Sequence, residues 1–134
     1  MIKFPAIAIL VFILIATVAW KSTSHRRDTL RKQRQTQYEA ALATYQNDLR
    51  PGQTRAQVDA VLAARNLPIE ELRLDSNSWD KVVRIGREHS IHWYCAFDDI
   101  DIRLQFNASA PDAPASPADS LSLISLYTRP RDCL

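Results

Sequence analysis

Three side chains that could bind a metal follow one another at intervals of three residues: His89, His92 and Cys95. Imidazole and thiolate groups are the ligands that zinc and copper prefer. If residues 92–97 form a strand, however, His92 and Cys95 point to opposite faces and cannot both reach one ion. We therefore expect solvated histidines, no metal site and no cofactor.

A group of carboxylates follows directly, at Asp98, Asp99 and Asp101. Asp99 and Asp101 would share one side of a strand, as paired catalytic carboxylates or calcium ligands do. The segment lacks the glycine and the distal glutamate of a calcium loop. We expect these carboxylates to form a solvated edge of the sheet.

Other catalytic arrangements find little support. The chain has only two glycines, Gly52 and Gly86, which excludes a glycine-rich phosphate loop. Cys95 and His92 are too close within one strand to face each other as nucleophile and base. The sequence therefore predicts no catalytic residues and no small-molecule substrate, and a metal or thiol enzyme around Cys95 stands as the second alternative.

The only two cysteines, Cys95 and Cys133, lie in different predicted strands. A disulfide between them would stabilise the fold by roughly 4 kcal/mol through the entropy of closing the loop. Such bonds persist in oxidising compartments. Two unpaired thiols are the open alternative.

The N-terminus carries an apolar run at residues 4–20, which Lys21 ends. A helix of this length spans about 25 Å, close to the ~30 Å hydrocarbon core of a bilayer. We interpret residues 1–20 as a transmembrane anchor or an uncleaved signal. Small residues at Thr17 and Ala19 leave a cleaved signal peptide open.

A basic segment follows the apolar run, while the rest of the chain is net acidic and the overall charge is +2. The expected contacts with anionic lipid head groups, each worth about 1 kcal/mol, are Lys21, Arg26, Arg27, Arg31, Lys32 and Arg34. The segment has no interleaved aromatic residues, so we predict the lipid bilayer and not nucleic acid as its partner. The positive-inside rule would keep this flank cytoplasmic, whereas the signal-like start and the cysteine pair favour a periplasmic, extracytoplasmic domain, which we prefer.

Two helices are expected before the strands. Residues 28–49 lack glycine and proline, and their second half carries an apolar stripe at spacings of four, three and four. That stripe, formed by Tyr38, Leu42, Tyr45 and Leu49, predicts packing on a domain at 38–134, with 21–37 as a basic juxtamembrane stalk. A dimerising coiled coil is the alternative for the stripe. Thr54 and Gln57 have the spacing of a capping box, which predicts a second helix that ends near Asn66.

The remainder predicts an antiparallel sheet. Apolar and polar residues alternate from Ile100 to Phe106, so Ile100, Ile102, Leu104 and Phe106 should face the core while Asp101, Arg103 and Gln105 face water. Further strands are expected at 81–85, 93–97 and 121–127, with a loop at 86–90 and a β-bulge or a strand end at 123–124. Residues 107–120 should form a flexible loop. The fold class is therefore α+β, with two helices packed on three or four antiparallel strands.

This order of elements resembles the SmpA/OmlA family of small bacterial envelope lipoproteins, also called BamE-like, over about residues 49–127. The turn and helix start at 49–58 (LRPGQTRAQV), His92-Trp93-Tyr94, the strand at 102–106 and Leu121-Ser122-Leu123-Ile124 carry the likeness. The chain differs from the family in having no lipidated cysteine, in Ala64-Arg65-Asn66-Leu67-Pro68 where a Gly-x-Pro often ends the helix, and in its stalk. The resemblance implies an envelope location and a non-enzymatic part that binds another protein.

We therefore predict a membrane-anchored bacterial envelope protein that acts as a non-catalytic protein-interaction or structural module. The expected interaction surface is aromatic, with Trp93 and Tyr94 joined by Trp79. The partner is an envelope protein whose identity the sequence does not reveal. A secreted, inhibitor-like binding module is the first alternative, because a long hairpin tip can enter an enzyme cleft.

Overall fold

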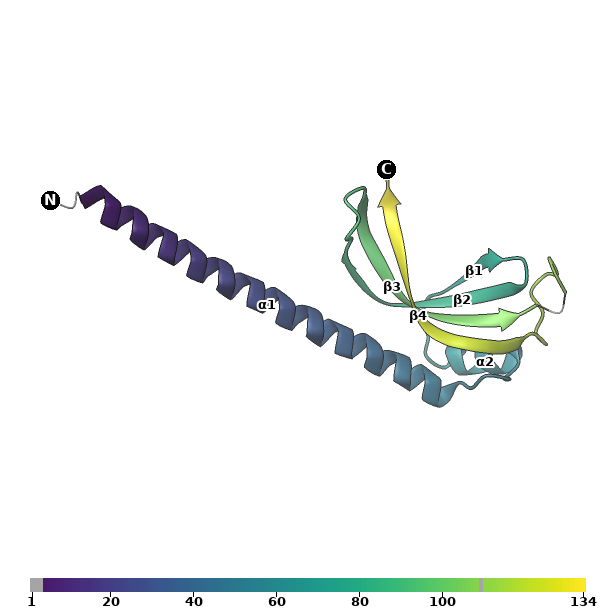
Figure 1. Ribbon diagram of the computed structural model, residues 1–134. Coiled ribbons are helices and arrows are strands. Elements are labelled where there is room, and N and C mark those ends of the chain that lie inside the picture. The colour runs from purple at the N-terminus through teal and green to yellow at the C-terminus, as the bar shows by residue number, and fades with distance from the viewer. Residues whose placement is uncertain (1–3, 109) are drawn as a thin grey trace. The chain divides into compact units, whose positions relative to one another are not determined.

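The computed structural model describes the backbone of residues 4–108 and 110–134, and the side chains of residues 25–73, 76–108 and 110–134. The fold is α+β, with two helices followed by four antiparallel strands in the order β1-β2-β3-β4 (Figure 1). The elements are α1 (Phe4–Asp48), α2 (Arg55–Ala63), β1 (Ile69–Asp75), β2 (Ser78–His89), β3 (Cys95–Asn107) and β4 (Ser120–Cys133). The strands β2 and β4 are longer than predicted, and β3 joins the two strands that were predicted separately at 93–97 and 100–106. The strand β1 was not predicted as a separate strand.

The chain divides into two compact units, residues 1–37 and residues 38–134. Helix α1 is continuous, whereas the sequence pattern predicted an anchor and a separate stalk helix. Its continuity has a simple cause, because residues 6–50 contain neither glycine nor proline. No helix in the described part of the chain is both long enough and apolar enough for a membrane crossing. The predicted anchor at residues 1–20 lies outside the described side chains.

Two backbone features separate the helices. Helix α1 ends before Pro51 and Gly52, and Gly52 has a φ of 92°, a conformation that glycine adopts without strain. The predicted capping box is confirmed, since the Thr54 side chain accepts a hydrogen bond from the backbone of Gln57 and the Gln57 side chain accepts one from the backbone of Thr54. Asn66 has a φ of 52°, the left-handed conformation expected of it, although α2 itself ends at Ala63.

The hydrophobic core lies between the helices and one face of the sheet. The stripe on α1 packs as predicted, with Tyr45 and Leu49 buried and Leu42 partly buried against them. Helix α2 covers the same face of the sheet (Figure 1). The fully or nearly buried members of this core are Tyr45, Leu49, Val58, Leu62, Val83, Ile102, Leu104, Phe106, Leu121 and Ile124. The alternation in β3 is thus confirmed at Ile102, Leu104 and Phe106, and Ile100 is partly buried.

A β-bulge at Ile85 changes the phase of β2. Arg84 pairs with Asp101 and Gly86 pairs with Ile100, so one residue of β2 has no partner opposite it. The strand continues beyond the bulge to His89, and the predicted loop at 86–90 is therefore wrong. A side chain on Gly86 would meet the ring of Tyr38, because a Cβ added there would lie 2.6 Å from Tyr38 Cε1. Glycine at this position lets the end of α1 approach β2 closely.

The connection between β3 and β4 was expected to have nothing to bury. Instead Arg55 N donates a hydrogen bond to Asp119 O at 2.8 Å, Ala56 N donates to Pro117 O at 3.1 Å, and Asp119 is buried. This segment is therefore tied to the start of α2. A bulge in β4 lies at Ser122, one residue before the predicted position, because Phe106 pairs with Leu121 and Gln105 pairs with Leu123.

Candidate interaction site: an aromatic tip held by a disulfide

The hairpin between β2 and β3 ends in a short loop, residues 90–94, which we call the tip. Two apolar side chains on it are almost fully open to solvent, Trp93 at 90% and Ile91 at 83% exposure, and Tyr94 is 42% exposed. The rings of Trp93 and Tyr94 lie edge to face with their centroids 5.8 Å apart. Trp93 was predicted in a strand, but β3 begins only at Cys95, so Trp93 projects from a turn.

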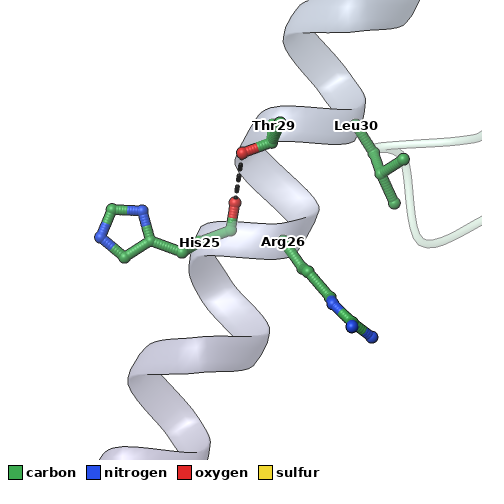
Figure 2. A pocket seen from close by; sticks show the side chains of 4 residues that line it. All are labelled: His25, Arg26, Thr29 and Leu30. Atoms are coloured by element: carbon green, nitrogen blue, oxygen red, sulfur yellow. Dashed lines mark hydrogen bonds between the residues drawn. The ribbon is translucent and has the colours of Figure 1, made fainter.

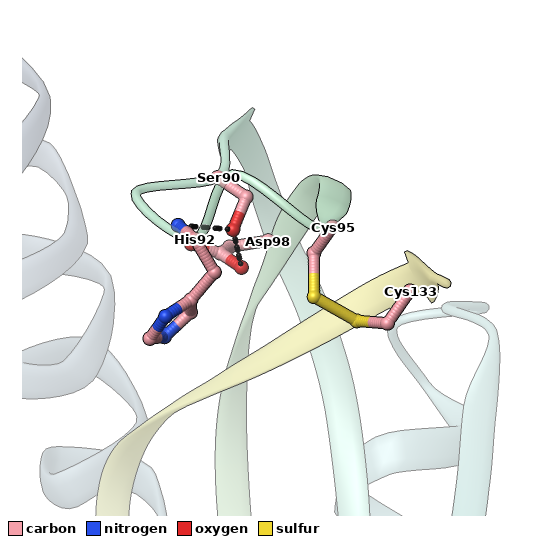
Figure 3. The surroundings of a disulfide bond; sticks show 5 residues. All are labelled: Ser90, His92, Cys95, Asp98 and Cys133. Atoms are coloured by element: carbon pink, nitrogen blue, oxygen red, sulfur yellow. Dashed lines mark hydrogen bonds between the residues drawn. A yellow bond between two sulfur atoms is a disulfide. The ribbon is translucent and has the colours of Figure 1, made fainter.

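Hydrogen bonds hold the base of the tip in one conformation (Figure 3). The hydroxyl of Ser90 donates to Asp98 Oδ1 at 2.9 Å and accepts from the backbone N–H of His92 at 3.1 Å. Cys95 N donates to His92 O at 3.0 Å, which closes the turn. Asp98 is buried, so this carboxylate organises the loop and does not belong to a solvated edge, as had been expected.

A disulfide between Cys95 and Cys133 joins the base of the tip to the end of β4 (Figure 3). The two cysteines are direct partners in the β3–β4 ladder. Leu134 N also donates a hydrogen bond to Tyr94 O at 2.9 Å, which fixes the backbone beside the exposed rings. The sulfur of Cys95 is therefore bonded to carbon and sulfur only, and in this form it offers neither a metal ligand nor a thiolate nucleophile.

The structure separates the predicted aromatic residues. Trp79 lies near the start of β2, and its indole N–H donates to Ala113 O at 2.8 Å. The tip follows the other end of β2, about ten residues and ~33 Å of strand away. Trp79 is therefore part of the domain's packing around the β3–β4 connection, and only Trp93 and Tyr94 of the predicted set share a surface.

The face of the sheet opposite α2 carries a charged cluster that was not predicted from the sequence. Asp99 and Asp101 were expected to face water, but both side chains have an exposure of 0%. They are covered by arginine side chains from β2 and β4. The bulge at Ile85 is responsible, because it places Arg84 and Arg87 on the same side of β2, where both reach Asp99.

Asp99 is surrounded by three guanidinium groups. Arg87 Nε donates to Asp99 Oδ1 at 2.8 Å, and Arg84 Nη2 and Arg131 Nε lie 2.8 Å and 3.3 Å from Asp99 Oδ2. Burial by itself raises the pKa of the Asp99 carboxyl, but the hydrogen bond from Arg87 and the charges of Arg84 and Arg131 outweigh it and lower that pKa below its ordinary value. Asp99 is therefore an ionised, structural carboxylate.

The pKa of Asp101, only two residues away, is shifted in the opposite direction. Arg129 Nη2 lies 3.2 Å from Asp101 Oδ2, but neither oxygen of Asp101 has a hydrogen-bond partner within the described structure. Burial raises the pKa of Asp101, the charge of Arg129 lowers it in part, and the neighbouring Asp99 raises it further, so that the pKa is above its ordinary value.

The Arg129 side chain also links the two edge strands of the sheet, β4 and β1. Its Nη2 donates to Glu70 Oε2 at 2.8 Å, although β4 and β1 are separated by two strands. Three strand spacings amount to about 14 Å, so the sheet must curl toward this face, as the bent strands in Figure 1 show. This hydrogen bond raises the pKa of Arg129 and lowers that of Glu70.

A sequence signal for this cluster did exist. Asp99 and Asp101 alternate in β3, and Arg129 and Arg131 alternate in β4, so each pair shares one strand face. The matching pair in β2, Arg84 and Arg87, is three residues apart, and in a strand without a bulge this spacing would point the two side chains to opposite faces.

The predicted membrane-surface residues all lie on α1, within residues 21–34. The described members Arg26, Arg27, Arg31 and Lys32 are exposed and Arg34 is partly buried, while the side chain of Lys21 lies outside the described residues. A shallow hollow here is lined by His25, Arg26, Thr29 and Leu30. Figure 2 shows these side chains spreading from consecutive turns of one helix, with Thr29 Oγ1 donating to His25 O at 2.9 Å, so they converge on no common point.

Comparison with known proteins adds no assignment. The chain matches no family of known proteins, no curated protein and no solved structure. Its function is therefore inferred from the site itself.

Proposed function

We propose that this protein is a membrane-anchored, non-catalytic interaction module of a bacterial envelope, with its domain on the extracytoplasmic side, and that it docks onto a partner protein through Trp93. The observation that carries this proposal is the disulfide-held tip. A tryptophan that is 90% exposed keeps a large apolar surface in water, and docking would remove that surface from water. Tryptophan and tyrosine are also the residues that most often supply the binding energy of protein interfaces.

The rigidity of the tip favours binding over a packing role. Ser90, Asp98 and the disulfide already hold the loop in place, so little conformational entropy remains to be lost when Trp93 enters a partner. A core tryptophan would instead be covered by its own chain, as the partly buried Trp79 is. The projecting shape suits a partner with an apolar recess.

The disulfide also supports an oxidising, extracytoplasmic compartment. This agrees with the resemblance to SmpA/OmlA envelope proteins and outweighs the positive-inside rule, because six basic residues bias the orientation of a segment without forbidding the other one. The apolar run at residues 4–20 serves as the anchor in this proposal, and the basic residues after it contact lipid head groups.

A photo-crosslinking amino acid placed at position 93 of the full chain, in the bacterium that encodes it, tests the docking role. We expect one discrete adduct that is competed by added wild-type protein and not by the Trp93→Ala variant. Position 114, an exposed proline in the β3–β4 connection, serves as the matched control and should give no such adduct. Equal labelling from both positions would refute a specific role for the tip.

A secreted, inhibitor-like module would use the same projecting tip, and it differs in the fate of the N-terminus. Mass spectrometry of the mature protein distinguishes the two functions. Retention of residues 1–20 in the membrane fraction supports the anchored module, whereas cleavage after Ala19 supports the secreted one.

A further inference from the structure

The curled face of the sheet contains a second concave site, separate from the tip. This pocket has a volume of about 230 Å³ and is lined by Pro68, Ile69, Glu70, Val82, Arg84 and Arg129. Val82 forms an apolar floor with an exposure of 2%, although it lies on the face opposite the core. The volume is below the range of drug-sized sites, about 300–1,000 Å³, and corresponds to a group the size of one side chain.

Two guanidinium groups line this pocket, that of Arg84 from β2 and that of Arg129 from β4. The side chain of Arg84 is 39% exposed, and its Nη2 forms an ion pair with Asp99 Oδ2 at 2.8 Å. Arg129 forms ion pairs with Glu70 and Asp101. Its Nε–H is buried and has no acceptor in the described structure, and an unsatisfied buried donor is costly.

The charge of the cluster indicates the charge of its ligand. Four arginines, at positions 84, 87, 129 and 131, surround three carboxylates, at positions 70, 99 and 101, which leaves one positive charge unbalanced. The carboxylates at 99 and 101 are fully buried, so the layer in contact with solvent consists mainly of guanidinium groups. A single monovalent anion would neutralise the cluster, and the Glu70 carboxylate would repel a dianion such as phosphate.

We propose that this pocket binds a carboxylate carried on a short apolar stem. The carboxylate takes its hydrogen bonds from Arg84 and Arg129, in the planar geometry that guanidinium groups favour. The stem rests on Val82. Glu70 already occupies Arg129 from within the chain, and it therefore acts as an internal competitor for the incoming carboxylate.

The chemistry could come from a free carboxylic acid or from the end of a peptide chain, and ligand titrations separate the two. The full chain in detergent micelles, with labelled isoleucine and valine methyl groups, is titrated at pH 7 with butanoate and with acetyl-Ala-Ala-Val bearing a free C-terminus. We expect saturable shifts at Val82 and none at Val58 in the core. Tighter binding of the peptide assigns a chain terminus, and equal or weaker binding assigns a free acid.

The neutral isosteres butanamide and acetyl-Ala-Ala-Val-amide, and inorganic phosphate, are the controls for the ligand. Arg84→Gln should weaken carboxylate binding about tenfold or more, because a charged hydrogen bond is lost. Glu70→Gln removes the internal competitor and should strengthen carboxylate binding. Because the Glu70 side chain is 46% exposed, we expect an increase in affinity of only about two- to fivefold. Arg50→Gln, an exposed position with the same loss of charge, should change nothing.

Three results would overturn the proposal: equal shifts with butanamide, phosphate binding as tightly as butanoate, or unchanged binding in both the Arg84 and Glu70 variants. The Glu70 variant keeps the test decisive if Arg84→Gln fails to fold. None of these measurements depends on Trp93, so the carboxylate site and the docking role of the tip are tested separately.

Discussion

Asp99 and Asp101 offer a matched pair of substitutions with opposite expected effects on stability. Both side chains are fully buried, lie two residues apart on the same face of β3, and keep their size but lose their charge when changed to asparagine. We expect Asp99→Asn to destabilise the domain and Asp101→Asn to stabilise it slightly at neutral pH. The difference lies in their partners, since among the described residues Asp99 forms ion pairs with three arginines and Asp101 forms one, with Arg129.

The magnitudes follow from those partners. Removing one member of a buried ion pair costs about 3–5 kcal/mol. The side chains of Arg84, Arg87 and Arg131 are 39–47% exposed and can regain water, which reduces the expected loss for Asp99→Asn to about 2–3 kcal/mol. Asp101→Asn removes a buried charge without hydrogen bonds and leaves Arg129 paired with Glu70, so we expect a gain of about 1 kcal/mol.

The effects of the two substitutions on stability should also depend on pH in different ways. The pKa of Asp101 is raised on folding, so its ionisation opposes folding, and that cost appears as the pH rises above the unfolded value of about 3.9. The gain from Asp101→Asn should therefore be greatest near pH 7 and vanish below about pH 4. The pKa of Asp99 is lowered, so its contribution is present above about pH 3.9 and is lost as the pH falls through the folded value.

Thermal unfolding of the full chain in detergent, followed by near-ultraviolet circular dichroism between pH 3 and pH 7, measures both effects. For a domain of this size, 1 kcal/mol corresponds to about 4–8 °C in the melting temperature. Asp99→Asn should thus melt about 10–20 °C lower than wild type at pH 7. Equal destabilisation by the two substitutions would refute the assignment of different roles to the two carboxylates.

Three further predictions concern the framework that positions the sites. Gly86→Ala should destabilise by about 1–3 kcal/mol, because its Cβ would meet the ring of Tyr38, and a double-mutant cycle with Tyr38→Ala should show strong coupling in thermal unfolding. Thr54→Ala should cost about 1 kcal/mol by the same assay, because it removes the capping box of α2. The double variant Cys95→Ser, Cys133→Ser should lose about 4 kcal/mol, and limited proteolysis should cleave its tip faster than that of the wild type.

The cap and the disulfide each have a matched comparison. Thr44→Ala changes an exposed threonine whose hydroxyl only donates to Ala40 O within α1, and it should leave stability nearly unchanged. A cost for Thr44→Ala as large as that for Thr54→Ala would contradict the role of the cap. For the disulfide, unchanged proteolysis of the tip in the double variant would show that hydrogen bonds alone hold it.

Local interactions explain which parts of the fold were predictable. The capping box, the apolar stripe on α1 and the core residues of β3 depend on spacing within a single element, and the structure confirms them at Thr54, Tyr45 and Leu104. The extent of β2 was missed because Gly86 suggested a loop. Only the ring of Tyr38, which is 48 positions earlier in the chain, shows why glycine is required there.

The charged face shows the limit of sequence patterns most clearly. Alternation correctly placed Asp99 and Asp101 on one side of β3, and it assigned that side to water because charged residues usually remain hydrated. Burial of these carboxylates requires Arg84 and Arg87 to share a face through the bulge, and it requires Arg129 to reach Glu70 across a curled sheet.

The amino-acid sequence by itself determined the α+β class, the start of α2 and the face of β3 that enters the core, because each depends on residues a few positions apart. Tertiary structure alone decided that Asp99 and Asp101 are buried, that Trp79 and Trp93 lie far apart, and that a disulfide holds the tip. These features depend on register, bulges and sheet curvature. Such properties are set by the packing of elements distant in the chain, and no local periodicity encodes them.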